Sequence, residues 1–246
     1  MTDLHTHILP GMDDGAHTTE QSLAMLRAEA AQGVRQVALT PHFYRHRETE
    51  DAFLRRREEA WDRLQTAISA LSEEEQAALP RLSLGAEVAW QPNTGRWEAL
   101  EQLRIGENGP VLLELPFTPW SADMLRQLYD LRCRTRCTIL LAHLNRYFKG
   151  QKKEHIREIV SMGMAVQLDA DRMERFMDRR ALLRLLGQEG PFLLASDCHN
   201  LSDRKPCLGP AAAQLEKSLG AERSAVILVR SDALFSLLPA PKIATP

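Results

Sequence analysis

The chain has 246 residues, with 31 Lys and Arg against 33 Asp and Glu and a formal net charge of −2. Proteins that bind duplex nucleic acid or an acidic membrane surface usually have an excess of basic residues. This chain has no such excess, which argues against both classes. The length suits one α/β barrel or two small domains, and 44% hydrophobic residues are enough for a large core.

The start of the chain does not resemble a signal peptide, and no run approaches the roughly 18 apolar residues of a transmembrane helix. The four cysteines, Cys133, Cys137, Cys198 and Cys207, do not have the spacing of a disulfide framework. We therefore expect a cytoplasmic protein that does not insert directly into a membrane.

Apolar runs and amphipathic runs alternate along the chain. The apolar runs predict seven strands, at 3–8, 35–42, 82–87, 111–116, 137–143, 165–169 and 191–200. Helical spacing predicts helices at 19–32, 50–79, 122–132, 155–162 and 173–187, a short helix or turn at 93–104, and two helices over 209–238 before a loose tail. Near-continuous apolar strands separated by helices are typical of a parallel sheet covered on both faces. The pattern predicts an α/β fold, and seven strands predict a single-domain barrel over residues 1–246.

The first predicted strand carries His5-Thr6-His7 and leads into a loop with Asp13 and Asp14. Side chains alternate along a strand, so His5 and His7 point to the same face. The Pro and Gly residues of the loop allow a carboxylate to fold back over the end of the strand. Two imidazoles with a nearby carboxylate make half of a metal site.

Most of the other predicted strands also end in a residue type that binds metals. In β/α barrels the strand ends meet at one face, where the active site is assembled. The candidate ligands at these ends and on the first loop are His5, His7, Asp14, His42, Glu87, Glu114, His143, Asp197 and His199. Asp169 ends the sixth strand, and we expect it to act behind these ligands.

Nine nitrogen and oxygen donors are too many for one tetrahedral ion, so two or three ions with shared carboxylates such as Glu87 fit better. These donors suit Zn, Mn or Fe alike. Each residue alone also fits a purely structural role, because histidines at strand ends are often only hydrogen-bonded and a buried glutamate can pair with arginine. The joint pattern favours metal, because Glu114 and Asp197 lie in apolar runs where an uncompensated carboxylate is costly.

These residues and their neighbours resemble the polymerase-and-histidinol-phosphatase (PHP) superfamily. The similarity rests on His5-x-His7 with Leu-Pro-Gly-Met-Asp-Asp-Gly, Thr-Pro-His42, Gly-Ala-Glu87, Leu-Glu114, Ala-His143-Leu-Asn-Arg146-Tyr and Ala-Ser-Asp197-Cys-His199-Asn. Within the superfamily the chain most resembles the bacterial metal-dependent protein tyrosine phosphatases of capsule and exopolysaccharide gene clusters. The Asp-Asp-Gly and His-x-x-Arg-Tyr segments separate this branch from the histidinol phosphatases.

The resemblance implies a distorted (β/α)7 TIM-like barrel (PHP fold) with two to three divalent ions, commonly manganese, with Fe or Zn as alternatives. It also implies hydrolysis of phosphotyrosine on a tyrosine autokinase of exopolysaccharide synthesis. All nine candidate ligands match ligand positions of the family, and Arg146 and Arg204 match its phosphate-binding arginines. Asn145 stands where the family usually has an acidic residue, and Cys198 where it usually has a small one.

The expected chemistry is in-line attack on phosphorus by a metal-activated hydroxide, with Arg146 and Arg204 holding the phosphoryl oxygens. A phenolate leaving group, with a conjugate-acid pKa of about 10, needs less help from a general acid than an alkoxide. Cys198 and Arg204 also show the Cys-x5-Arg spacing of thiol phosphatases. We interpret that match as accidental, because the residues between them lack glycine and include the acidic Asp203.

Two other functions stay open from the sequence. One is a small-molecule phosphatase such as histidinol phosphatase, and the other is a catalytically silent PHP module that serves as a partner-binding domain. Silent modules tend to lose ligands, whereas all nine candidates are present here. We expect no nucleic-acid partner, and exposed helices would permit an oligomer. His17, His46 and His155 are interpreted as solvated.

Overall fold

The computed structural model describes residues 1–236, and its strands form two parallel sheets. The smaller sheet has the order β1-β2-β4, made of β1 (Thr2–Thr6), β2 (Gln36–Leu39) and β4 (Arg81–Leu84). The larger has the order β3-β5-β6-β7-β8-β9, made of β3 (His42–Phe43), β5 (Glu87–Ala89), β6 (Val111–Glu114), β7 (Ile139–Leu141), β8 (Ala165–Asp169) and β9 (Phe192–Ala195). The predicted α/β fold with parallel strands is confirmed.

Two of the seven predicted strands are each broken in two. The run 35–42 becomes β2 and β3, separated at Pro41, which has no N–H to donate to a neighbouring strand. The run 82–87 is broken before β5 at Gly85, where a Cβ atom would lie 2.8 Å from Ile105 Cγ1. These breaks divide the strands between two sheets, and the described residues contain no single closed sheet.

The two sheets nevertheless meet where β1 lies beside the end of β9. Asp197 N donates to His5 O at 2.9 Å, and His7 N donates to Cys198 O at 2.9 Å. Thr6 and Cys198 form an isolated parallel bridge. These contacts bring the end of the chain's last strand next to the His-x-His sequence of its first.

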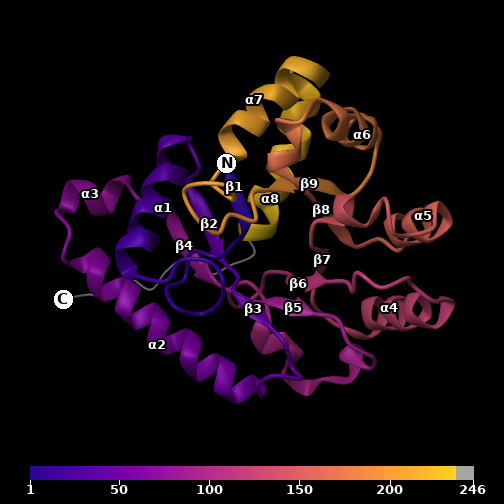
Figure 1. The fold of residues 1–246 in the computed structure, drawn as a ribbon, viewed down its shortest axis with the longest axis horizontal. Helices are drawn as coiled ribbons and strands as arrows, with labels where there is room; N and C mark the ends of the chain where they lie inside the picture. Colours follow the sequence, from indigo (N-terminus) through magenta and orange to yellow (C-terminus); the bar gives the residue numbers. More distant parts are fainter. Residues whose placement is uncertain (237–246) are drawn as a thin grey trace.

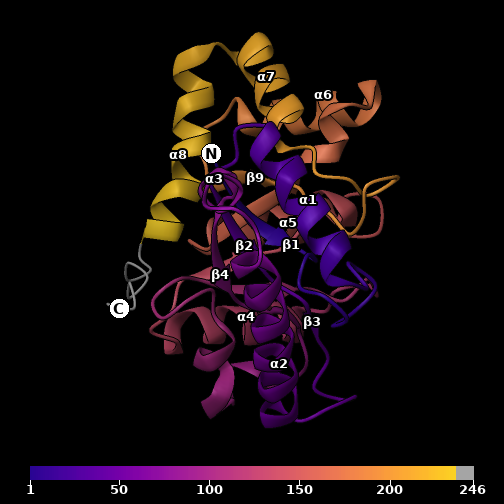
Figure 2. The ribbon, with the colours of Figure 1, turned by 90° about the vertical axis from the view of Figure 1, so that its left-hand side faces the viewer.

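Helices surround the strands (Figure 1). Their bounds are α1 (Thr19–Ala31), α2 (Glu50–Ser69), α3 (Glu73–Ala78), α4 (Ala122–Arg134), α5 (Lys153–Ser161), α6 (Phe176–Leu186), α7 (Leu208–Leu219) and α8 (Ala221–Ser236). Four 3-10 helices complete the set: η1 (Thr94–Arg96), η2 (Glu98–Leu103), η3 (Leu144–Tyr147) and η4 (Ala170–Met173). In Figure 1, α1 to α3 lie on one side of the strands and α4 to α6 on the other. In Figure 2, α8 lies at the upper left, with α1 to its right and α2 below them in the middle.

The predicted helix 50–79 is wrong as a single element. It is two helices, α2 and α3, because Ser72 and Glu75 form a capping box that starts a new helix. The two helices predicted over 209–238 are α7 and α8, and the predicted tail after Leu238 lies outside the described residues. None of the described helices is long and apolar enough to cross a membrane.

The core has two parts. The larger cluster packs between the strands and the surrounding helices. The smaller cluster takes Leu4 and Ala38 from one sheet and Leu112, Leu140 and Leu193 from the other, together with a residue of α8. The space between the sheets is therefore filled with apolar side chains, and polar residues gather beyond the carboxyl ends of the strands.

Candidate metal centre

All nine candidate ligands lie at or just beyond strand ends, or on the loop after the first strand. His5 is in β1 and His7 follows it; Asp14 lies on the loop before α1; His42 and Glu87 begin β3 and β5; Glu114 ends β6; His143 follows β7; Asp197 and His199 follow β9. In β1 one extra residue lies between Asp3 and Thr6 relative to β2, which is a bulge next to His5. The Nε2 atoms of His5 and His7 are 3.1 Å apart, so the two imidazoles converge as the sequence predicted.

Glu87 is the buried carboxylate at the middle of the cluster. Its Oε1 lies 2.9 Å from His143 Nε2, and its Oε2 lies 2.7 Å from His42 Nδ1 and 3.3 Å from His5 Nε2. Burial alone would raise the pKa of Glu87, but the surrounding imidazoles outweigh it and hold the pKa well below the usual range. The Glu87 side chain is 1% exposed, and its ion-pair partners among residues 1–236 are all histidines.

Asp197 is a second buried carboxylate, on the other side of the two convergent histidines. Its Oδ1 lies 3.2 Å from His7 Nε2 and 3.3 Å from His5 Nε2. Burial works against ionisation here too, but His5, His7 and Arg146 keep the pKa of Asp197 well below its usual range. Asp197 and His143 both have left-handed backbone conformations, with φ of 52° and 31°.

Three groups of these residues have donor atoms within 4.8 Å of one another and could each hold a metal ion. They are His7, Asp14, His42 and His199; His5, His7 and Glu87; and His42, Glu87 and Glu114. The groups share members, which is the arrangement expected of adjacent ions with common ligands. His143 and Asp197 are outside these three groups but contact their members directly.

The histidines differ in their proton affinity. Burial, with the nearby charges of His7 and Arg204, lowers the pKa of His199 to about 3, so this imidazole is neutral and free to bind a metal. Burial would also lower the pKa of His5, but Glu87 and Asp197 raise it above the usual value. The pKa of His7 is raised well above its usual value, mainly by Asp13. The metal-free site therefore holds protons that a metal ion would displace.

Two residues that hold the histidines were not predicted from the sequence. Asp13 Oδ2 lies 2.7 Å from His7 Nδ1 and accepts from His42 N at 2.9 Å, while its Oδ1 accepts from Gly15 N at 3.0 Å. Gln167 Oε1 lies 2.8 Å from His5 Nδ1. Because Asp13 and Gln167 contact the Nδ1 atoms, the Nε2 atoms of His7 and His5 face the centre.

Signals for both residues were present in the sequence. Asp13 is adjacent to Asp14 and is two residues before Gly15. Only glycine fits at position 15, because a Cβ atom there would lie 2.0 Å from His7 O. Gln167 is two residues before Asp169 on β8, so strand alternation places both on one side. Asp169 does not contact the histidines directly. It accepts from Arg146 Nε at 2.7 Å and from Asn145 Nδ2 at 3.2 Å, consistent with the role behind the ligands that was expected.

Arg146 and Arg204 both reach Asp197. Arg204 Nη2 donates to Asp197 Oδ2 at 2.9 Å, and Arg146 Nη2 donates to the same oxygen. His199 N donates to Arg204 O at 2.8 Å. This hydrogen bond closes the loop after β9 and keeps Arg204 next to His199. Each guanidinium is partly exposed, so both line the edge of the centre that a ligand would approach.

Aromatic side chains form the rim of the site, and the sequence did not predict them. Phe117 is 61% exposed, with its ring nearly parallel to that of His143 at 6.3 Å between centroids. Tyr44 lies 5.3 Å from His42 by the same measure, beneath the guanidinium of Arg47. Tyr44 and Arg47 also line a pocket of about 440 Å³ that includes Asp14 and His42.

Cys198 is unsuited to act as a nucleophile. It is fully buried, and its Sγ lies 3.6 Å from Glu29 Oε1. Burial and the nearby carboxyl groups of Glu29 and Asp3 raise the pKa of the thiol well above its usual range. The geometry thus agrees with the interpretation of Cys-x5-Arg as accidental. Of the histidines expected to be solvated, His17 and His46 are exposed, whereas His155 is half-buried.

Several known proteins are similar to this chain over nearly its whole length. A family model described as "Capsular polysaccharide synthesis, CpsB/CapC" matches residues 1–234. The tyrosine-protein phosphatase YwqE of Bacillus subtilis (strain 168) is 30% identical over 264 residues, which covers 98% of this chain and 96% of that protein. The tyrosine-protein phosphatase CpsB of Streptococcus pneumoniae is 26% identical over 251 residues, with 93% and 95% covered.

A solved structure gives a further comparison. It comes from work on YwqE from Bacillus subtilis and CpsB from Streptococcus pneumoniae, described as unique metal-dependent tyrosine phosphatases. The matched chain superposes with a TM-score of 0.79 and 26% sequence identity, covering 97% of this chain and 96% of that one.

Proposed function

The chain belongs to the CpsB/CapC family of capsular polysaccharide synthesis, and on that premise we propose that it is a metal-dependent phosphoesterase that hydrolyses phosphotyrosine in proteins. The observation that carries the proposal is the convergence of buried imidazole and carboxylate donors on Glu87 and Asp197. Such a set of nitrogen and oxygen donors is the chemistry that binds divalent transition metals.

The donor atoms fit bound cations better than they fit one another. Glu87 Oε2 has imidazole nitrogens at 2.7 to 3.4 Å but no hydrogen bond of normal geometry among the described residues. Asp197 Oδ1 and His199 Nε2 are likewise buried without a hydrogen-bond partner in residues 1–236. Buried polar atoms are nearly always satisfied, so atoms left open in one cluster support a bound ion.

We propose two to three ions, with manganese as the metal in use and Fe or Zn as alternatives. The ligands would be the nine candidates: His5, His7, Asp14, His42, Glu87, Glu114, His143, Asp197 and His199. The shared membership of His7, His42 and Glu87 among the three groups supports more than one ion. When bound, the ions would supply a water acidic enough to be deprotonated near neutral pH, together with positive charge for the phosphoryl oxygens.

The chain's own contribution to catalysis would be to bind and orient the phosphoryl group. Arg146 and Arg204 each present a guanidinium beside Asp197, and planar guanidinium groups suit phosphoryl oxygens. Asp169 fixes the Arg146 side chain through both Nε and Nη2, so Nη1 would be the group that reaches the substrate. Phe117 offers an exposed ring face next to His143, where the aryl ring of phosphotyrosine could stack.

The partner in this proposal is a phosphotyrosine protein, and a bacterial tyrosine autokinase of capsule or exopolysaccharide synthesis is the expected one. The family description and the names of the relatives support this assignment. We also propose a cytoplasmic location. The four described cysteines are all free, which suits a reducing compartment.

For the fold we propose that the two sheets form one distorted seven-stranded barrel in a single domain over residues 1–246. The hydrogen bonds between Asp197 and His5 and between His7 and Cys198 support this arrangement. So does the apolar cluster that draws side chains from both sheets.

The test starts with elemental analysis of protein purified without chelator. Hydrolysis of p-nitrophenyl phosphate, a phosphotyrosine peptide and histidinol phosphate would then be measured with and without Mn²⁺. We expect two to three ions per chain and Mn²⁺-dependent cleavage of the phosphotyrosine peptide. Asp197→Asn should lower turnover by at least about 100-fold, since it removes a ligand rather than a supporting residue. Asp62→Asn, an exposed change on α2, is the matched control.

Each alternative has its own result in this experiment. A clear preference for histidinol phosphate would replace the proposal with a small-molecule phosphatase. Bound metal without turnover of any substrate would indicate a silent module. Turnover that persists after chelation, or that Asp197→Asn leaves unchanged, would refute the metal-dependent mechanism.

A further inference from the structure

A groove lies next to the metal centre and is lined mainly by cations and apolar side chains. The residues that define this basic groove are Arg146, Phe148, Lys149, Arg172, Met177 and Leu182, its volume is about 710 Å³, and it is also lined by Asn145, Asp178 and Ala181. The first three come from η3 and the residues after it, and the others come from η4 and α6. A groove of this size can hold several side chains of a ligand.

The basic groove is continuous with the phosphoryl site through Arg146. The guanidinium of Arg146 contacts Asp169 and Asp197 and also lines the groove. A substrate whose phosphoryl group lies at the metal centre would therefore have its neighbouring atoms at the mouth of the groove.

Positive charge is concentrated around the groove although the chain is nearly neutral. The segments 145–153 and 171–184 contain nine Lys and Arg but only three Asp and Glu, whereas the whole chain has 31 against 33. Two of those acids, Asp171 and Asp178, already lie 3.3 and 3.4 Å from Arg172.

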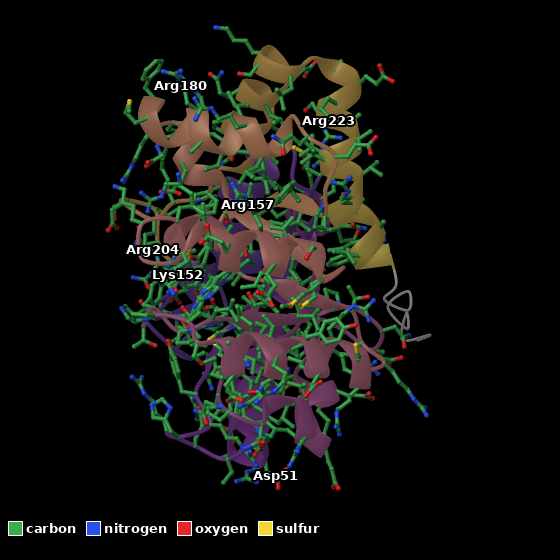
Figure 3. All side chains as sticks on the ribbon, turned by 90° about the vertical axis from the view of Figure 1, so that its right-hand side faces the viewer. Asp51, Lys152, Arg157, Arg180, Arg204 and Arg223 are labelled. Carbon is green, nitrogen blue, oxygen red and sulfur yellow. The ribbon has the colours of Figure 1, made fainter. Side chains whose placement is uncertain are left out.

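Several of these cations have no acidic partner. Lys149, Lys152 and Arg180 form no ion pair among residues 1–236. Figure 3 looks onto the side of the molecule that carries α4 to α6, and its labelled Lys152, Arg157 and Arg180 all lie there. The uncompensated charge on this side complements an acidic ligand.

Apolar groups are exposed beside these cations. Phe176 and Met177, in the first turn of α6, are 62% and 74% exposed, and Phe148 lines the groove half-buried. Adjacent large apolar side chains left in water are typical of surfaces that bind a partner. An extended polyanion such as single-stranded nucleic acid would match the charge but would leave Met177 without a role.

We propose that the basic groove binds the peptide segment that flanks the phosphotyrosine, and that it selects acidic residues next to an apolar one. The inference rests on the proposed function and adds a sequence preference to it. Long-range attraction would act mainly on the rate of capture, so the preference should weaken as salt increases.

The test compares two phosphotyrosine peptides of equal length, one with two acidic residues and a leucine near the phosphotyrosine, the other with serines in those places. We expect the wild type to prefer the acidic peptide by about three- to tenfold in kcat/KM, from surface ion pairs of modest strength. Lys149→Glu should abolish or invert this preference, and Met177→Ser should reduce it. Lys217→Glu, an exposed change on α7, is the matched control. Turnover of p-nitrophenyl phosphate, which has no flanking residues, should not change in any of the three variants.

Binding of the same peptides, measured by fluorescence anisotropy, separates this inference from the proposed function. Charge-dependent binding that Lys149→Glu removes, without hydrolysis of any substrate, would keep the groove and refute the phosphatase. Hydrolysis with equal kcat/KM for both peptides and for Lys149→Glu would keep the phosphatase and refute the groove. The binding of a labelled single-stranded oligonucleotide would be measured in the same way. If Lys149→Glu weakened oligonucleotide binding as much as peptide binding, and Met177→Ser left peptide binding unchanged, the inference would also be overturned.

Discussion

Replacing Asp13 with asparagine should weaken metal binding without removing any proposed ligand. The carboxylate makes three contacts through two oxygens: Oδ2 with His7 Nδ1 at 2.7 Å and His42 N at 2.9 Å, and Oδ1 with Gly15 N at 3.0 Å. These contacts hold the pKa of Asp13 below its usual range although burial acts to raise it. An asparagine has only one acceptor oxygen, so whichever way the amide turns, its NH₂ group faces at least one N–H donor.

The size of the effect follows from those contacts. A hydrogen bond to a charged acceptor contributes about 1.5–3 kcal/mol, and a neutral one about 0.5–1.5 kcal/mol. Asp13→Asn therefore removes about 1–2 kcal/mol of support for the imidazole of His7 and sets a donor against a donor. At about 1.4 kcal/mol per tenfold, the affinity for the ion at His7 should fall by about 5- to 30-fold, which overlaps the lower part of the roughly 10- to 100-fold range known for residues that orient metal ligands.

The assay is a Mn²⁺ titration of p-nitrophenyl phosphate turnover, with calorimetric titration of metal-free protein. We expect Asp13→Asn to shift the Mn²⁺ concentration for half-maximal activity upward, with much of the activity restored at saturating metal. Asp62→Asn should behave like the wild type. An unchanged Mn²⁺ requirement in Asp13→Asn would show that His7 is not held for metal binding and would refute the reasoning.

Three more expectations concern pH, the aromatic rim and the buried thiol. His5 and His7 have raised pKa values in the metal-free protein, so their charged contacts stabilise it below about pH 6.5 and are lost as the pH rises through those raised values. Metal binding displaces these protons, so the increase in Tm caused by Mn²⁺ should grow from pH 5.5 to 8.5; a constant increase would contradict proton displacement. Phe117→Ala should lower kcat/KM for a phosphotyrosine peptide by about three- to tenfold through loss of ring stacking. It should affect a phosphoserine peptide less, and equal losses on both would exclude stacking on the substrate ring. Cys198→Ala should retain p-nitrophenyl phosphate turnover, and inactivation would revive a thiol mechanism.

The sequence predicted the class of fold because its strands are short apolar runs with helices between them. It did not predict the breaks within strands that depend on distant atoms. The break at Gly85 reflects a close approach of Ile105, twenty positions further along the chain, which no local pattern reveals. The break at Ser72 was different, since the capping box Ser-Glu-Glu-Glu is local and could have been recognised.

For the candidate site, the sequence predicted residues whose type is unusual for their position. Glu114 and Asp197 stand out because charged residues interrupt or end apolar strands. Gln167 and Phe117 do not stand out, since an amide in a strand and a phenylalanine in a loop are common. Their relation to His5 and His143 depends on how strands far apart in sequence are brought together.

The left-handed backbone at His143 and Asp197 has a cost for the fold. A residue with a Cβ atom is less stable in this conformation than glycine by up to about 1–2 kcal/mol, so glycine would relieve that strain. Selection for heat resistance alone should therefore favour substitutions at positions 143 and 197, and those same substitutions would remove two of the proposed metal ligands. Under the proposed function, stability and activity compete at these two positions, so a thermostability screen of this chain must include an activity readout to avoid converging on inert variants.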